Sequence, residues 1–188
     1  MLDSSNNIGS VTFERMKRYS ETLVREMNVE DCGVRIGFMK YSSAPMIQFN
    51  MNTYHDTDTI NRAVDAIHYT RGMANMADAF KEVRTRMFNT VDDRSNVRNV
   101  IYLLSDGSND IKREETMMEA EMTLSDGINI IPIGIQLRNR YELENIAASQ
   151  GVTTYEIDSE LQLLAMSDQM LRPVMDSKYC YNFFSYHL

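Results

Sequence analysis

The 188-residue sequence lacks several features that assign many proteins to a function class. It has no apolar run of about 18 residues, so we expect no membrane span. It does not begin with a basic segment followed by an apolar stretch, so we expect no signal peptide. The nucleotide-binding and hydrolase motifs Gly-x-x-x-x-Gly-Lys, Gly-x-Gly-x-x-Gly and Gly-x-Ser-x-Gly are absent as well. These absences are consistent with an intracellular protein or with a segment of a longer exported one.

Positive charge is scarce in this sequence. Lys and Arg together number 19 against 27 Asp and Glu, which leaves a formal net charge of −8. Proteins that bind nucleic acid normally carry a basic face, so we expect no nucleic-acid partner. Hydrophobic residues make up 43% and charged residues 24%, a balance that is typical of one folded globular domain of this length.

The spacing of apolar residues predicts alternating helices and strands. Ser42 to Ala44 is short enough to connect two strands as a hairpin, and residues 100–104 are apolar on both faces, as in the central strand of a parallel sheet. This order predicts an α/β fold with a doubly wound, mostly parallel sheet, one antiparallel edge strand and helices on both faces. We expect helices at 11–27, 56–67, 75–88, 112–124, 140–149 and 159–170, and strands at 34–41, 45–49, 97–104, 128–135 and 152–157.

Two polar segments lie where strands of this sheet should end. Asp3, Ser5 and Asn7 precede the first helix at two-residue spacing, which places their side chains on one side of an extended loop. Asp106 directly follows the central strand. Carboxylate and hydroxyl oxygens are suitable ligands for Mg²⁺. The alternative is that Asp3 and Ser5 only cap the first helix, and that Asp106 and Gly107 only form a turn.

Taken together, these residues resemble the von Willebrand factor type A (vWA) domain family. The family's metal-ion-dependent adhesion site has Asp-x-Ser-x-Ser after the first strand, a threonine before a middle helix, and Asp-Gly after the fourth strand. Asp3, Ser5 and Asp106 match this pattern, and Asn7 stands at the second serine. The resemblance implies a Rossmann-like domain over residues 1–176, followed by an aromatic tail at 177–188; it extends to 33–42, 126–135, 143–148 and Tyr155.

Two departures from the family pattern bear on the site. Ala74 occupies the position of the metal-ligating threonine, and Thr70, four residues earlier, is a poor substitute. The resemblance therefore implies a degenerate site that binds Mg²⁺, Ca²⁺ or Mn²⁺ weakly or not at all. The family also begins with a buried strand, of which only Met1 and Leu2 are present here. We expect the sequence to start inside a longer natural domain.

The family resemblance implies a non-catalytic adhesion module of an extracellular protein, with collagen or another matrix protein as its partner. Ligand contacts are expected from the loops above the strand ends, at Arg71, Asn75, Ser108 and Arg138. The aromatic tail is a binding strip, the lead-in to another domain, or a segment that packs locally under the sheet.

The two cysteines, Cys32 and Cys180, are weak evidence for a disulfide by their number alone. In the family's topology both lie on the face opposite the metal site, and the family is mainly extracellular. The resemblance therefore favours a Cys32–Cys180 disulfide over two free thiols.

Two other functions remain open at this stage. A Mg²⁺-dependent phosphoryl-transfer enzyme also uses an aspartate after the first strand, but dehalogenase-like enzymes have a second aspartate two residues later, where Ser5 stands here. An intracellular scaffold module with the vWA fold is the other alternative, and reduced, unpaired cysteines would favour it.

Overall fold

The computed structural model describes residues 1–88, 94 and 97–175 and contains a six-stranded sheet in the order β3-β2-β1-β4-β5-β6. Every neighbouring pair is parallel except β2 and β3, which form an antiparallel hairpin at one edge. This confirms the predicted sheet. Its strands are β1 (Leu2–Asp3), β2 (Phe38–Tyr41), β3 (Pro45–Phe49), β4 (Asn99–Ser105), β5 (Ile128–Gly134) and β6 (Tyr155–Glu156).

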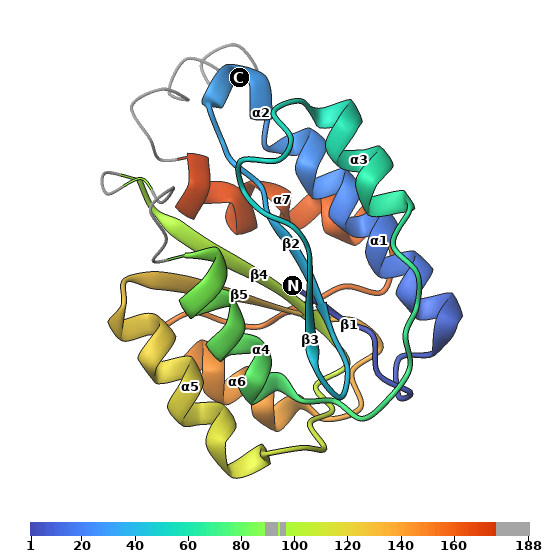
Figure 1. The fold of residues 1–188 in the computed structure, drawn as a ribbon, viewed down its shortest axis with the longest axis vertical. Helices are drawn as coiled ribbons and strands as arrows, with labels where there is room; N and C mark the ends of the chain where they lie inside the picture. Colours follow the sequence, from blue (N-terminus) through green and yellow to red (C-terminus); the bar gives the residue numbers. More distant parts are fainter. Residues whose placement is uncertain (89–93, 95–96, 176–188) are drawn as a thin grey trace.

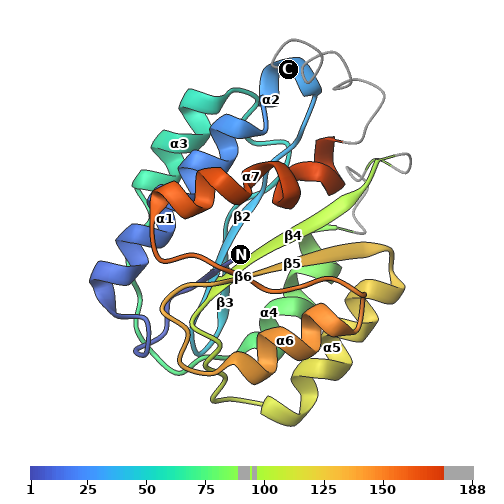
Figure 2. The same ribbon diagram turned by 180° about the vertical axis from the view of Figure 1, so that it is seen from behind.

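Helices cover both faces of the sheet, as Figures 1 and 2 show from opposite sides. One layer contains α1, α3 and α7, and the other contains α4, α5 and α6. In the described ranges, none of the helices combines the length and the apolarity needed to cross a membrane. They are α1 (Gly9–Glu26), α2 (Val29–Cys32), α3 (Thr57–Asp65), α4 (Met76–Glu82) with the π-helix η1 (Val83–Met87), α5 (Arg113–Ser125), α6 (Arg140–Ala148) and α7 (Glu160–Met175).

Strand β4 shows why its sequence is apolar on both faces. Tyr102 and Leu104 pack in the cluster formed with α1 and α7, whereas Ile101 and Leu103 pack in the cluster formed with α4, α5 and α6. Alternate side chains of a strand point to opposite faces, and here each face is buried under helices. The sheet therefore separates two hydrophobic cores.

Two strands are shorter than predicted. The strand expected at 34–41 pairs only over Phe38–Tyr41, and its register ends where Phe38 lies opposite Phe49. The strand expected at 152–157 pairs only at Tyr155 and Glu156. In both cases the apolar pattern extends beyond the ladder, because apolar residues next to a short strand still pack against the core.

The short strand β1 has a central position in the sheet. Leu2 and Asp3 pair with β2 on one side, and Leu2 pairs with Leu104 of β4 on the other. The carbonyl oxygen of Met1 extends the contact with β4 by accepting a hydrogen bond from the Leu104 amide at 3.0 Å. Asp3 is thereby fixed at the carboxyl end of a central strand.

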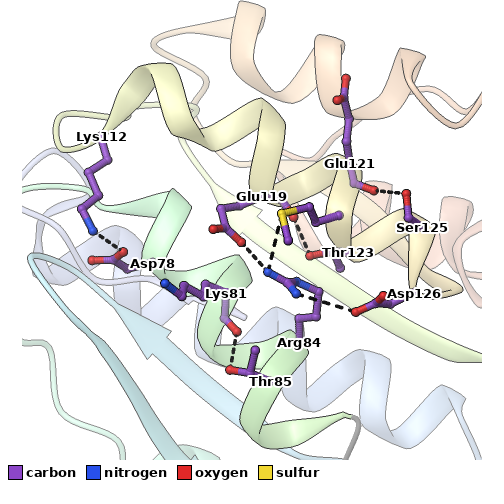
Figure 3. A network of polar contacts seen from close by, with 11 residues as sticks. Asp78, Lys81, Arg84, Thr85, Lys112, Glu119, Glu121, Thr123, Ser125 and Asp126 are labelled. Atoms are coloured by element: carbon purple, nitrogen blue, oxygen red, sulfur yellow. Dashed lines mark hydrogen bonds and ion pairs between the residues drawn. The ribbon is translucent and has the colours of Figure 1, made fainter.

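The helix predicted at 75–88 is divided into α4 and η1. A polar network, shown in Figure 3, ties this segment to α5. The Arg84 guanidinium lies 2.6 Å from the Glu119 carboxylate and 3.8 Å from that of Asp126. Lys112 Nζ, at the start of α5, lies 2.6 Å from Asp78 Oδ1 near the start of α4. The two helices are thus joined by charge pairs near both ends.

Some predictions concern parts that the structure does not describe. The side chain of Cys32, the whole of Cys180 and the tail at 177–188 lie outside the described residues. The Cys32–Cys180 disulfide, the role of the tail and the domain boundary at 176 therefore stay predictions.

Candidate metal centre

The predicted metal residues meet at the carboxyl edge of the sheet. Asp3 ends β1, Asp106 follows β4, and these strands are neighbours. Ser5 lies in the loop that connects β1 to α1. The exposed fraction of the residue is 0% for Asp3 and Ser5 and 2% for Asp106. Two carboxylates on neighbouring strands are thus almost completely buried from solvent.

Hydrogen bonds fix the orientation of both carboxylates. The Ser5 amide donates to Asp3 Oδ1 at 2.9 Å, and the Ser105 hydroxyl donates to Asp3 Oδ2 at 3.0 Å. The Ser108 amide donates to Asp106 Oδ1 at 2.8 Å. The Ser108 contact shows that Asp106 forms a turn, as expected. The alternative prediction, that Asp3 and Ser5 cap the first helix, is wrong. The residue that precedes α1 is Ile8, and no side chain caps that helix.

Three buried oxygen atoms around this point make no hydrogen bond: Ser5 Oγ, the Tyr41 hydroxyl and Asp106 Oδ2. Tyr41 is the register partner of Asp3 across β1 and β2. A buried polar group without a partner is destabilising by about 1–3 kcal/mol. Hydroxyl and carboxylate oxygens are also the ligands that Mg²⁺ and Ca²⁺ take in proteins. These atoms therefore fit a bound divalent cation.

The raised pKa of Asp3 also fits a bound cation at this site. Burial, with a smaller contribution from the nearby Asp106 charge, raises the pKa of Asp3 from 3.8 to about 7, against the opposing effect of hydrogen bonds from Ser5 and Ser105. Burial, together with the charge of Asp3, raises the pKa of the Tyr41 hydroxyl well above its ordinary value. A cation bound here would offset the repulsion between the two carboxylates and favour their ionised forms.

Asp110 also belongs to this region, and sequence reasoning missed it. Its Oδ2 accepts hydrogen bonds from the Asn7 side-chain amide at 3.3 Å and from the Ala74 backbone amide at 2.9 Å. The Asp110 and Ile111 amides in turn donate to the Ala74 carbonyl oxygen, at 2.8 and 2.9 Å. An exposed carboxylate thus lies beside Ala74, the residue expected at the position of the family's threonine. The only indication in the sequence is that Asp110 lies in the loop that follows the central strand.

The described residues contain no group of three or more Asp, Glu, His or Cys side chains arranged to hold a metal. A cation at Asp3 and Asp106 would therefore depend on the Ser5 hydroxyl, the Asn7 amide oxygen and water for its remaining ligands. Asn7 can offer that oxygen because its amide nitrogen is the atom that donates to Asp110. Such a donor set, rich in neutral oxygens, suits weakly bound Mg²⁺.

The predicted ligand-binding residues are distributed unevenly around the centre. Arg138 is exposed, and its Nε lies 3.5 Å from Asp106 Oδ2. Ser108 is half-buried beside the same carboxylate. Arg71 is exposed in the neighbouring loop, where its φ is +67°. Asn75 is 2% exposed, and its amide caps α4 and binds Asp78, which favours a supporting role in that loop.

Hydrogen bonds join that neighbouring loop to the site. The Tyr69 hydroxyl donates to the Ser5 carbonyl oxygen at 2.7 Å, and the Thr70 amide donates to Ser4 Oγ at 2.8 Å. The Asn6 amide donates to the Gly72 carbonyl oxygen at 2.8 Å. Thr70 therefore contacts the metal loop through its backbone amide. The loops after β1, before α4 and after β4 are thus joined by hydrogen bonds at this edge of the sheet.

Comparison with known proteins agrees with this geometry. The chain is 26% identical over 181 residues to the collagen alpha-4(VI) chain of Mus musculus, covering 96% of this chain and 7% of that protein. It is 23% identical over 199 residues to vitrin of Mus musculus, covering 97% of this chain and 30% of that protein. The chain thus spans less than a third of the length of either relative.

Among solved structures, proximal thread matrix protein 1 from the mussel byssus superimposes with a TM-score of 0.77 at 22% identity, covering 90% of this chain and 46% of the other. A further structure of that mussel protein, with a zinc-occupied metal-ion-dependent adhesion site, has a TM-score of 0.75 at 21% identity, covering 90% of this chain and 46% of the other. The family model for the von Willebrand factor type A domain matches residues 1–169. The chain therefore belongs to the von Willebrand factor type A domain family.

Proposed function

We propose that this vWA domain is a non-catalytic protein-binding module of an extracellular matrix protein. Its ligand binds at the loops above the carboxyl ends of the strands, with a weakly held divalent cation at Asp3, Ser5, Asn7 and Asp106. The proposal rests on the three buried oxygen atoms without hydrogen-bond partners at this edge of the sheet. Relatives named as collagen chains and a mussel thread matrix protein support the matrix setting.

The residues of the site would offer two kinds of ligand to the cation. Asp3 and Asp106 supply negative charge, and Ser5 and Asn7 supply neutral oxygens. The cation would supply a positive charge that attracts and orients a carboxylate of the partner. Mg²⁺ is the first choice for such oxygen ligands, with Ca²⁺ and Mn²⁺ as alternatives. The zinc-occupied site of the mussel protein supports metal binding at this place in the fold.

The surface around the centre is suited to a protein partner. Arg138 and Arg71 are exposed and favour acidic groups. Two apolar side chains lie in the loop before α4 and in the first turn of α6, Met73 at 51% and Tyr141 at 63% exposed. Tyr, Met and Arg are enriched where proteins bind one another. Collagen, or another matrix protein that presents a carboxylate beside apolar residues, is the partner we propose.

The site lacks the second carboxylate of the enzyme alternative. Phosphoryl transfer of the dehalogenase type requires an aspartate two residues after the first, and the residue here is Ser5. Ser5 is completely buried, and so could not act as an exposed nucleophile. Both observations favour binding without catalysis.

The test is calorimetric titration of the protein with Mg²⁺, Mn²⁺ and Ca²⁺, followed by binding to immobilised triple-helical collagen in Mg²⁺ or EDTA. We expect weak cation binding that Asp106→Ala abolishes, and collagen binding that is reduced by EDTA and by the same variant. Glu156→Ala, which removes a carboxylate on β6 that pairs with Arg140 and not with the metal residues, is the control. Absence of both cation and collagen binding in a folded protein would refute the proposal.

A further inference from the structure

We infer that Arg138 competes with the divalent cation for Asp106, so that the exposed guanidinium acts as a built-in counter-ion of the metal-free site. This inference rests on the proposed metal site. It concerns how tightly that site binds the cation, and it assigns to Arg138 a role other than direct contact with a protein ligand.

The backbone that carries Arg138 is anchored to the metal loop. The Arg138 and Asn139 amides both donate to the Asp106 carbonyl oxygen, at 2.8 and 3.2 Å. On the other side of Arg138, Leu137 packs so closely on Gly134 that a Cβ atom there would lie 2.6 Å from the leucine side chain. The start of the Arg138 side chain is thus held beside Asp106.

The contact itself involves the one carboxylate oxygen of Asp106 that is not hydrogen-bonded. Oδ1 accepts the Ser108 amide, whereas Oδ2 is buried, makes no hydrogen bond and lies 3.5 Å from Arg138 Nε. This distance is that of an ion pair rather than of a good hydrogen bond. Asp106 Oδ2 is also the oxygen left for a cation, so the arginine and the metal would share one atom.

The exposure of the two partners shows which one can move. The Asp106 side chain is 2% exposed and held by its neighbours, whereas the Arg138 side chain is 66% exposed. A cation that binds Asp106 repels the guanidinium, and Arg138 is free on its outer side to swing into solvent. Metal binding must therefore overcome the Arg138–Asp106 attraction, which lowers the affinity of the site.

Arg140 provides a matched control two residues along the chain. It is also exposed, at 56%, but pairs with Glu156 of β6 instead of a metal residue. Replacing Arg140 removes the same charge from the same part of the surface and leaves the Asp106 contact in place. Any general effect of net charge on cation binding should therefore be seen in both variants.

The test is calorimetric titration of Mg²⁺ and Mn²⁺ into the wild type, Arg138→Gln and Arg140→Gln. We expect Arg138→Gln to bind the cation about two- to fivefold more tightly, as for loss of a partly exposed ion pair. Arg140→Gln should stay close to the wild type. In EDTA, Arg138→Gln should also melt at a lower temperature than the wild type, and saturating Mg²⁺ should remove that difference.

Wild-type binding with equal or weaker binding by Arg138→Gln would overturn the inference and leave the metal site intact. Equal tightening by Arg138→Gln and Arg140→Gln would also overturn it, because the effect would then be one of general charge. If neither the wild type nor Arg138→Gln binds a cation, the proposed metal-dependent function fails and this inference fails with it.

Discussion

The carbonyl oxygen of Asn139 lies directly against Gly107, so closely that a Cβ atom on Gly107 would be 1.7 Å from it. Gly107 also has a φ of +80°, a conformation that residues with a side chain rarely adopt. The turn after β4 and the loop before α6 can therefore approach each other only with glycine at this position. This approach brings Asp106 and Arg138 together.

Gly107→Ala should destabilise the domain more than Gly127→Ala. Gly127 has a similar φ of +78° but open space around it, so alanine there introduces backbone strain alone, about 1–2 kcal/mol. At Gly107 the clash adds about 1–3 kcal/mol of overpacking. Urea unfolding followed by circular dichroism measures the difference. Equal losses for the two variants would contradict the close approach of the loops.

Ala74→Thr should strengthen cation binding relative to Ala74→Val. Ala74 is fully buried, and threonine and valine add similar bulk there, but only threonine adds an oxygen, at the position where the family pattern predicts a metal ligand. One charge-assisted contact contributes about 1.5 kcal/mol, or roughly tenfold in affinity. Titration with Mg²⁺ checks this. Equal affinities of the two variants would show that the missing hydroxyl does not limit the site.

The contribution of Asp3 to the stability of the metal-free protein should fall as the pH rises from about 4 to about 7. The pKa of Asp3 is raised from 3.8 to about 7 in the folded protein, so the folded state holds this proton more tightly than the unfolded chain. The contribution of Asp3 is therefore complete below pH 3.8 and is lost as the pH approaches 7. Melting temperatures in EDTA across this range measure it.

Asp3→Asn is the control for that pH dependence, because the amide does not titrate. The difference in melting temperature between the wild type and Asp3→Asn should change in favour of the variant as the pH rises. Excess Mg²⁺ should stabilise the wild type more at pH 7.5 than at pH 5, since it favours the ionised carboxylate. A difference that stays constant with pH would refute the assignment to Asp3.

Glu119→Gln should destabilise the domain by about 3 kcal/mol, because it leaves the buried Arg84 charge without its nearest partner (Figure 3). The side chains of Arg84 and Glu119 are only 11% and 9% exposed. Glu82→Gln is the control, since its partner Arg86 is 68% exposed and the pair spans one helical turn. That change should cost less than about 0.5 kcal/mol. Similar losses in urea unfolding would contradict this difference.

Much of the fold could be predicted because periodic burial is encoded locally. The alternation of Ile101, Tyr102, Leu103 and Leu104 between two cores is visible as an apolar run, and it correctly predicts a central parallel strand. The ends of strands were less predictable. Residues 34–37 have the apolar pattern of a strand, but pairing requires a partner at the right register, and the register with β3 ends at Phe38.

The candidate site was predictable where motif and strand order coincide. Asp3 ends β1, Ser5 lies in the loop that follows it, and Asp106 follows β4; neighbouring parallel strands bring their carboxyl ends to one edge. The π-helical turn at Val83–Met87 was not predictable, because an apolar helical period does not distinguish it from continued α-helix.

The order of apolar and polar residues along the chain was enough to predict the type of fold, the order of its elements and the carboxylate and hydroxyl groups at the strand ends. Which of these groups lack a hydrogen bond, and which charges face each other, depends on the packing of distant segments. Ser5 Oγ, the Tyr41 hydroxyl and Asp106 Oδ2 make no hydrogen bond because of what surrounds them in space. Arg138 faces Asp106, from which it is separated by 31 residues of the chain, because two loops pack together at Gly107. Contacts of this kind depend on distances between distant segments, and local sequence patterns do not contain them.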